Sequence, residues 1–378
     1  MRQIILTILV TLILFTAPEV LNAGKPGYLE LKTAREAFRG RLVVKNSQST
    51  WLMSREGKLH EVQLRSVKSF KKMNSTFRPD TTRNLRLVLQ KELGKDYEIA
   101  VAGQYIVAAA PGRAKAYAAV CDELYRSFQR YFSTRGFKVK RPEFPLVAIV
   151  FRSRDEFATY CQGDKFQISA NLAGYYHPLT NRVALFERNG NSLAANGAPV
   201  LHSTLVAKVQ SRQMDNRVHD TLIHEATHQV AYNAGLHRRV GDTPRWIVEG
   251  LATMFEPEGA RQNSRRGSVM NRVNKDRYLR FGNFAKLRRK KNSLKAFIQN
   301  DSMYKSNTLD FYAQAWALSF FLCETRPREY ARYLITIAQR PDFSQYTAKE
   351  RLADFQSVFG KKTDWLETKF LRYMTRLK

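Results

Sequence analysis

The chain has 378 residues, of which 44% are hydrophobic and 12% aromatic, a composition that supports a large packed core and excludes a disordered or fibrous protein. Its 63 lysines and arginines against 33 acidic residues give a formal net charge of +30. A field of this strength attracts polyanions, such as anionic lipid, acidic envelope polymers, nucleic acid or acidic polypeptides.

Residues 1–23 have the layout of a secretory signal peptide. A positive start at Arg2 precedes an unbroken apolar run over residues 4–15, and the sequence VLNA then leads to the polar GKPG. This run is shorter than the roughly 20 residues that span a bilayer, so a cleaved signal fits better than the alternative, an uncleaved anchor. We therefore expect an exported protein, periplasmic or secreted, with no transmembrane segment after signal removal.

Residues 24–98 are predicted to form a small β-rich domain. The short β-type runs RLVVKN, STWLMS and HEVQLRSV are separated by turn formers, including REGK at residues 55–58. The unit vaguely resembles small SH3-like barrels, although it carries no specific motif. The segment FKKMNSTFRPDTTRN is interpreted as a connector to a helix at LRLVLQKEL.

Residues 99–378 are predicted to form the second domain. GQYIVAAAP and FPLVAIVF are predicted strands, and the helix between them repeats apolar residues at intervals of three and four from Tyr117 to Phe132. SANLAGYYHPLTNRVALFE predicts two strands around a turn at residues 179–181. The last 70 residues are predicted to be helical, with a capping box at Thr347 and Glu350. The expected fold class is therefore α+β, with a β-rich unit, a mixed sheet and a helical C-terminal half.

The three cysteines, Cys121, Cys161 and Cys323, all lie in apolar contexts. They are predicted to be small buried hydrophobic residues. A disulfide between Cys121 and Cys161 is the alternative.

The segment TLIHEATHQVAYNAG, residues 221–235, places two of the seven histidines four positions apart. In a helix that begins near residue 216 and ends at residues 233–235, His224 and His228 project from one face and can chelate one ion. Glu225 lies about 100° further round the helix, where it can reach a metal-bound water without binding the metal. A catalytic zinc site needs a third protein ligand and an open fourth position.

The segment DTPRWIVEGLATMFE, residues 242–256, offers that third ligand. A cap at Asp242 or Thr243 and Pro244 at the first helical position predict a second helix, antiparallel to the first, that carries Glu249 across to the histidines. A carboxylate in so apolar a helix is costly unless it binds a cation. The sequence thus predicts one Zn²⁺ held by His224, His228 and Glu249, and a polar helix without metal is the alternative.

Together, HEATHQ and WIVEGLATMFE resemble the gluzincin branch of the zinc metallopeptidases, the peptidase MA-like group, and within it an uncharacterised family of exported bacterial proteins. The resemblance extends over roughly residues 100–378. It implies that Glu225 is the catalytic base and that Tyr312, with Tyr304 in reserve, stabilises the oxyanion; a core aromatic is the other reading of Tyr312.

The resemblance also implies that AGYYHP, residues 173–178, is an edge strand that holds substrate, with Tyr175, Tyr176 and His177 as possible subsite residues. One position departs from the pattern. Many gluzincins have an aspartate four residues after the ligand glutamate, and here that position is Thr253, so Glu256 is the candidate to orient a ligand histidine.

A basic segment over residues 261–295 holds thirteen lysines and arginines and a single acid, Asp276. The aromatic residues Tyr278, Phe281 and Phe284 are interleaved with them. We interpret the segment as a positive rim on the active-site cleft that favours acidic substrates or anionic envelope polymers, and a solvated loop is the alternative. Nucleic acid is not an expected partner, because no nucleic-acid-binding motif is present and the protein is expected to be exported.

These observations predict an exported zinc metallopeptidase that hydrolyses peptide bonds with a zinc-bound water and Glu225 as general base. A catalytically inactive pseudo-peptidase scaffold and a basic envelope- or polyanion-binding protein are the alternatives. Metal content separates the last of these from the first two, and the activity of Glu225→Gln separates the peptidase from the scaffold.

Overall fold

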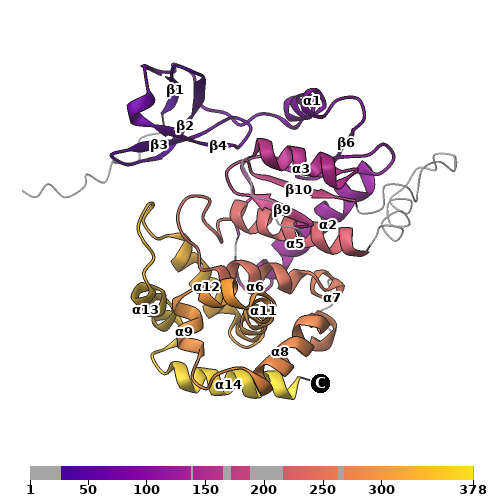
Figure 1. Cartoon of the computed structure of the whole chain (residues 1–378), viewed down its shortest axis with the longest axis vertical. Coiled ribbons are helices and arrows are strands. Elements are labelled where there is room, and N and C mark those ends of the chain that lie inside the picture. The colour runs from indigo at the N-terminus through magenta and orange to yellow at the C-terminus, as the bar shows by residue number, and fades with distance from the viewer. Residues whose placement is uncertain (1–26, 138, 165–171, 188–215, 263–267, 378) are drawn as a thin grey trace, which may run out of the picture.

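The computed structural model describes residues 27–137, 139–164, 172–187, 216–262 and 268–377 (Figure 1). Within these ranges a β-rich N-terminal region is followed by a mixed sheet and a helical C-terminal half, which confirms the predicted α+β class. The predicted signal peptide lies outside the described residues. No helix in the described ranges is both long and apolar enough to cross a bilayer.

The first sheet contains five antiparallel strands in the order β4-β3-β2-β1-β5. Its strands are β1 (Tyr28–Lys32), β2 (Ala37–Lys45), β3 (Ser49–Met53), β4 (Leu59–Gln63) and β5 (Ser69–Lys72). Leu31, Leu52 and Val62 form its small core. The buried Arg239 donates hydrogen bonds of 2.7 Å to the carbonyl oxygens of Gly57 and Pro178, and so ties this sheet to the second. The likeness to SH3-like barrels stays a prediction.

The second sheet has the strand order β6-β7-β8-β10-β9. Its strands are β6 (Glu98–Ala102), β7 (Tyr105–Ala109), β8 (Leu146–Phe151), β9 (Gly174–His177) and β10 (Arg182–Phe186). The three central strands are parallel, and the two edge strands, β6 and β9, are antiparallel to their neighbours. Strand β9 is thus an edge strand, as predicted for AGYYHP.

Helices cover both faces of the second sheet, which therefore has buried, continuously apolar strands. The helices α2 (Ala114–Ser133) and α5 (Asn216–Asn233) pack on one face, together with Val107 and Val183. The helices α1 (Thr82–Leu93) and α3 (Arg154–Gly163) pack on the other face, against Ile106 and Ala184. Because side chains alternate along a strand, successive residues point into the core on one face and then into the core on the other.

The helical half is organised around α11, which is buried along most of its length. Its helices are α6 (Arg245–Phe255), α7 (Glu258–Arg261), α8 (Lys275–Leu287), α9 (Leu294–Gln299), α10 (Ser302–Ser306), α11 (Thr308–Thr325), α12 (Pro327–Ala338), α13 (Ala348–Phe359) and α14 (Thr363–Arg376). Two 3-10 turns, Leu64–Ser66 and Val269–Arg272, complete the described elements. The predicted capping box at Thr347 and Glu350 is confirmed at the start of α13.

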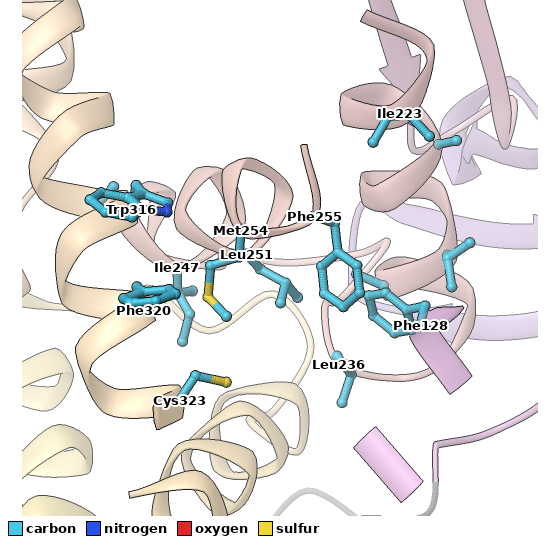
Figure 2. Close-up of a cluster of buried hydrophobic side chains, with 14 of the residues drawn as sticks. Phe128, Ile223, Leu236, Ile247, Leu251, Met254, Phe255, Trp316, Phe320 and Cys323 are labelled. Atoms are coloured by element: carbon cyan, nitrogen blue, oxygen red, sulfur yellow. The ribbon is translucent and has the colours of Figure 1, made fainter. Parts of the chain in front are cut away.

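Helix α6 lies between α11 and the helices of the sheet (Figure 2). Its apolar residues Ile247, Leu251, Met254 and Phe255 fill the space between Trp316, Phe320 and Cys323 on one side and Phe128 and Ile223 on the other. The close approach depends on Gly250, because a Cβ added there would lie 2.5 Å from the carbonyl oxygen of Ala315. The same packing fixes the position of Glu249, next to this glycine.

Several local predictions need correction. Helix α6 begins at Arg245, because Pro244 has an extended ψ of 129° and therefore precedes the helix. The strand β6 and the helix α3 were not predicted, and part of the SANLAG segment lies outside the described residues. The cysteines are free and buried, as predicted; Cys121 and Cys161 belong to the two different cores, on opposite faces of the second sheet.

Candidate metal centre

Helix α5 holds His224 and His228 in a fixed orientation above the sheet. The side chain of Gln229, which is fully buried, donates hydrogen bonds to the carbonyl oxygens of Val147 (3.0 Å) and Asn181 (2.7 Å). One turn later Asn233 donates to the side chain of Asn181 at 2.7 Å. Since a buried amide is stable only when its donors are satisfied, these bonds fix the rotation of α5 about its own axis.

Helix α6 packs against α5 and directs Glu249 toward the two histidines. The Oε2 atom of Glu249 lies 3.3 Å from Nε2 of His224 and 3.5 Å from Nε2 of His228. The two Nε2 atoms are 3.1 Å apart. Among the residues that the structure describes, these three form the group whose ligand atoms could hold a metal ion. The structure therefore brings together all three predicted ligands.

The separations of these atoms fit a tetrahedral ion. Two ligands bound tetrahedrally at zinc distances lie roughly 3.4 Å apart, which is close to all three separations in this group. Within the described part of the chain, the buried Oε2 of Glu249 has no hydrogen-bond partner. A buried carboxylate oxygen without a donor is costly, and a cation at this point removes that cost. The donor set, two imidazole nitrogens and one carboxylate oxygen, is one that zinc accepts in catalytic sites.

The electrostatics of the group also favour a cation. Burial raises the pKa of Glu249, but the adjacent His228 and His224 outweigh burial, and the pKa lies below its ordinary value. Burial lowers the pKa of His224, but the adjacent carboxylates of Glu249 and Glu256 outweigh burial, and the pKa lies well above its ordinary value. The site therefore stabilises a positive charge among its carboxylates.

Glu256 orients His224 from the side opposite the candidate metal. Its Oε1 lies 2.8 Å from Nδ1 of His224, and its Oε2 accepts a hydrogen bond of 2.5 Å from Asn274. The hydroxyl of Thr253 instead bonds the carbonyl oxygens of its own helix, at Glu249 and Gly250. Glu256 thus occupies the place that Thr253 leaves, as the sequence suggested. Asn274 was not predicted, because nothing in the sequence links it to a residue eighteen positions earlier.

Glu225 faces the edge strand β9. The backbone N–H of Tyr176 donates a hydrogen bond of 2.8 Å to Oε2 of Glu225. Strand and helix approach closely at Gly174, where an added Cβ would lie 2.9 Å from the side chain of Thr221. The carboxylate of Glu225, next to His224, is therefore held at the edge of the sheet, beside the candidate metal ligands.

Tyr312 lies beside the candidate metal centre. Its ring centroid is 6.3 Å from that of His224 and 6.3 Å from that of Tyr304. Burial and then the charge of Glu249 raise the pKa of Tyr312, so its hydroxyl stays protonated and can donate a hydrogen bond. Its catalytic role stays a prediction.

The three possible subsite residues have different surroundings. The side chain of Tyr175 is buried in the core on the α3 face, and its hydroxyl donates to Asp164 at 2.9 Å. The side chain of Tyr176 is buried on the α5 face, and its hydroxyl donates to Asn181 at 3.0 Å. His177 is half-buried, and its Nδ1 accepts from the N–H of Thr180. Both tyrosine side chains are thus engaged in the fold, and the strand backbone is the part of β9 that faces the site.

The basic segment borders the centre only in part. Its helix α8 buries Phe281 and Phe284, so the segment is not simply a solvated loop; residues 263–267 lie outside the described ranges. The guanidinium of Arg277 lies 5.1 Å from the ring centroid of Tyr312. A second guanidinium, that of Arg245 outside this segment, lies 4.6 Å from the ring centroid of Tyr304. Positive charge therefore stands next to both tyrosines.

Comparison with known proteins bears on this region of the chain. No curated protein matches it. Residues 219–344 match the model of a family described as a protein of unknown function (DUF1570). This range includes His224, His228, Glu249, Glu256 and Tyr312.

Proposed function

We propose that the protein is an exported zinc-dependent metallopeptidase of the gluzincin type. The observation that carries this proposal is the convergence of Nε2 of His224, Nε2 of His228 and Oε2 of Glu249, at separations of 3.1 to 3.5 Å, near the carboxylate of Glu225. In a polar helix that binds no metal, nothing would offset the cost of bringing these atoms together. One of them, Oε2 of Glu249, is buried and has no hydrogen-bond donor among the described residues. When bound, zinc supplies Lewis acidity to a scissile carbonyl and to an attacking water.

The residues around the ligands fit the remaining roles of a peptidase. Glu225 follows His224 directly and is close enough for its charge to act on His224 and Tyr312, so it serves as the base that takes a proton from water and passes it to the leaving amine. Its hydrogen bond to Tyr176 fixes one carboxylate oxygen and leaves the other for the proton. Tyr312, protonated and next to His224, serves as a donor to the developing oxyanion.

The substrate in this proposal is an extended peptide that adds to the edge of β9. An exposed strand edge recognises an extended chain through main-chain hydrogen bonds. Arg277 and Arg245, beside the two tyrosines, favour a peptide that carries acidic residues near the scissile bond.

The test begins with metal analysis of the purified protein and a peptide-library cleavage assay, run beside Glu225→Gln. We expect one zinc ion per chain, cleavage by the natural protein, and unchanged zinc content but lost cleavage in the variant. Glu61→Gln, the same chemical change on an exposed strand of the first sheet, is the matched control and should cleave normally. Zinc without cleavage would identify a pseudo-peptidase scaffold, and a chain that does not bind zinc would overturn the proposal.

A further inference from the structure

Helix α8 exposes two leucines on the face that it turns away from the core. Leu279 is 65% exposed and Leu287 is 69% exposed, whereas Phe281 and Phe284 of the same helix are buried. The two leucines are eight residues apart, so they lie on one side of the helix about 12 Å from each other. Exposed leucines are common one at a time, but two on one helix face form an apolar stripe.

Helix α14 runs alongside α8 and adds a second exposed face. Phe370 of α14 packs on Phe281 of α8, and the hydroxyl of Tyr278 donates to the carbonyl oxygen of Leu377. The exposed face of α14 carries Trp365, which is 52% exposed. A groove of about 600 Å³ separates the two helices. Its lining is mainly apolar, with Leu279 and Lys286 on one rim and Arg372 on the other.

The charges around this apolar surface are mostly positive. In the described part of the chain, none of the following basic residues forms an ion pair with a carboxylate: Lys286, Lys290, Lys291, Lys369, Arg372 and Arg376. Lys369 instead lies over the ring of Trp365. Of the acids on these two helices, Glu367 is buried and paired with Arg289, whereas Asp276 and Asp364 are exposed in the first turns of α8 and α14 and are outnumbered by the basic residues. The surface is thus apolar in the middle and basic around it.

We propose that this surface, formed by α8 and α14, docks on an anionic lipid bilayer. Leucine and tryptophan side chains enter the boundary between headgroups and acyl chains, and lysines and arginines contact the anionic headgroups. An acidic polysaccharide or nucleic acid would use the basic residues but would gain nothing from two exposed leucines. The helices lie at the end of the molecule opposite the first sheet (Figure 1). The proposal does not depend on the metal centre or on peptidase activity.

The experiment compares binding of the full chain to vesicles of phosphatidylcholine alone and to vesicles of equal parts phosphatidylcholine and phosphatidylglycerol, at low and high salt. The double variant Leu279→Ser/Leu287→Ser should bind the anionic vesicles at least roughly tenfold more weakly, because two apolar side chains no longer enter the lipid. In the triple variant Lys286→Gln/Lys290→Gln/Arg372→Gln, the affinity for anionic vesicles should fall roughly fivefold for each charge removed, and the fall should be larger at low salt. Leu309→Ser, a change at a leucine that is 55% exposed at the start of α11, is the control and should bind normally.

Amide hydrogen exchange separates this docking from any binding by the apolar N-terminal run. Anionic vesicles should protect residues 275–287 and 363–376 in the natural chain and should not protect them in the double leucine variant. Unchanged exchange in these helices, or equal binding by the natural chain and the leucine variant, would overturn the proposal. Loss of binding only in the charge variant, together with equal binding to an acidic polymer, would also overturn it and would identify a polyanion surface.

Discussion

The Nδ1 atom of His224 lies 2.8 Å from Oε1 of Glu256, and Asn274 holds the other oxygen of that carboxylate at 2.5 Å. A ligand histidine whose second nitrogen is bonded in this way has a fixed tautomer, with Nε2 free for a metal and Nδ1 carrying the proton. Glu256 is therefore a positioning residue for His224.

We predict that Glu256→Ala lowers the affinity for zinc by about 10- to 100-fold, since loss of such a partner leaves the imidazole free to rotate. Glu256→Gln keeps an acceptor for the Nδ1 proton and should lose less. Competition with a chromophoric chelator measures both. Glu258→Ala, two residues further along, removes a carboxylate that accepts a hydrogen bond from Gln262; it is the control and should bind zinc like the natural protein. An affinity unchanged in Glu256→Ala would mean that packing alone orients the ring.

Tyr312→Phe removes one hydroxyl beside the metal centre and little packing. Because burial and Glu249 raise the pKa of Tyr312, its hydroxyl stays protonated near neutral pH and can donate a hydrogen bond. If it stabilises the oxyanion, kcat should fall by about 10- to 1,000-fold with a small change in KM, zinc affinity and pH profile. Tyr304→Phe, one ring further from His224, should have a smaller effect. Equal kcat for the natural protein and Tyr312→Phe would make Tyr312 a core aromatic.

The sequence was sufficient to predict that His224, His228 and Glu249 come together, because their arrangement is largely local. Two histidines four positions apart share a helix face by geometry alone, and Glu249 could be found because it is a carboxylate in an apolar helix. The strands β7, β8, β9 and β10 of the second sheet could also be predicted, since their apolar runs are bounded by turn residues, whereas β6 was missed.

Contacts between distant segments were beyond such reasoning. The hydrogen bonds of Gln229 to Val147 and Asn181 join residues that are 82 and 48 positions apart, and no local sequence pattern predicts them. The side chains of Tyr175 and Tyr176 could not be assigned to either core, because both neighbours are aromatic and the sheet is buried on both faces. Helix α3 was missed because its ten residues are mostly polar and bury only Phe157 and Cys161.

His237 makes the fold sensitive to acid. It is fully buried, and this burial, followed by the nearby His228, lowers its pKa to about 3. Its Nε2 has no hydrogen-bond partner among the described residues. The unfolded chain takes up a proton near the ordinary histidine pKa of about 6.5, whereas the folded chain does not. Stability from this residue is therefore fully present above pH 6.5 and falls as the pH drops toward 3.

At pH 5 the loss from this one residue amounts to about 2 kcal/mol relative to pH 7. In His237→Gln, the side chain cannot take up a proton. Between pH 7 and pH 5 the free energy of unfolding of this variant should therefore fall by about 2 kcal/mol less than that of the natural protein. Urea unfolding of both proteins with a chelator present checks this, because the other histidines contribute equally to each. Parallel pH dependence in the two proteins would show that His237 is protonated in the fold.

Two glycines in helices should respond oppositely to alanine. In α6 a Cβ at Gly250 would lie 2.5 Å from the carbonyl oxygen of Ala315 and would also meet the hydroxyl of Ser319, both on α11. The two helices must then separate, which we expect to lower the free energy of unfolding by about 1–3 kcal/mol or more. The shift would also move Glu249, the adjacent residue, away from the histidines, so zinc affinity should fall as well.

Gly282 in α8 provides the comparison, because an added Cβ there has no neighbour within 4 Å. Gly282→Ala should raise the free energy of unfolding by about 0.5–1 kcal/mol, since alanine restricts the unfolded chain and favours the helix. Urea unfolding and zinc titration of the two variants measure both effects. If Gly250→Ala bound zinc as tightly as Gly282→Ala, the position of Glu249 would not depend on the close packing of α6 on α11.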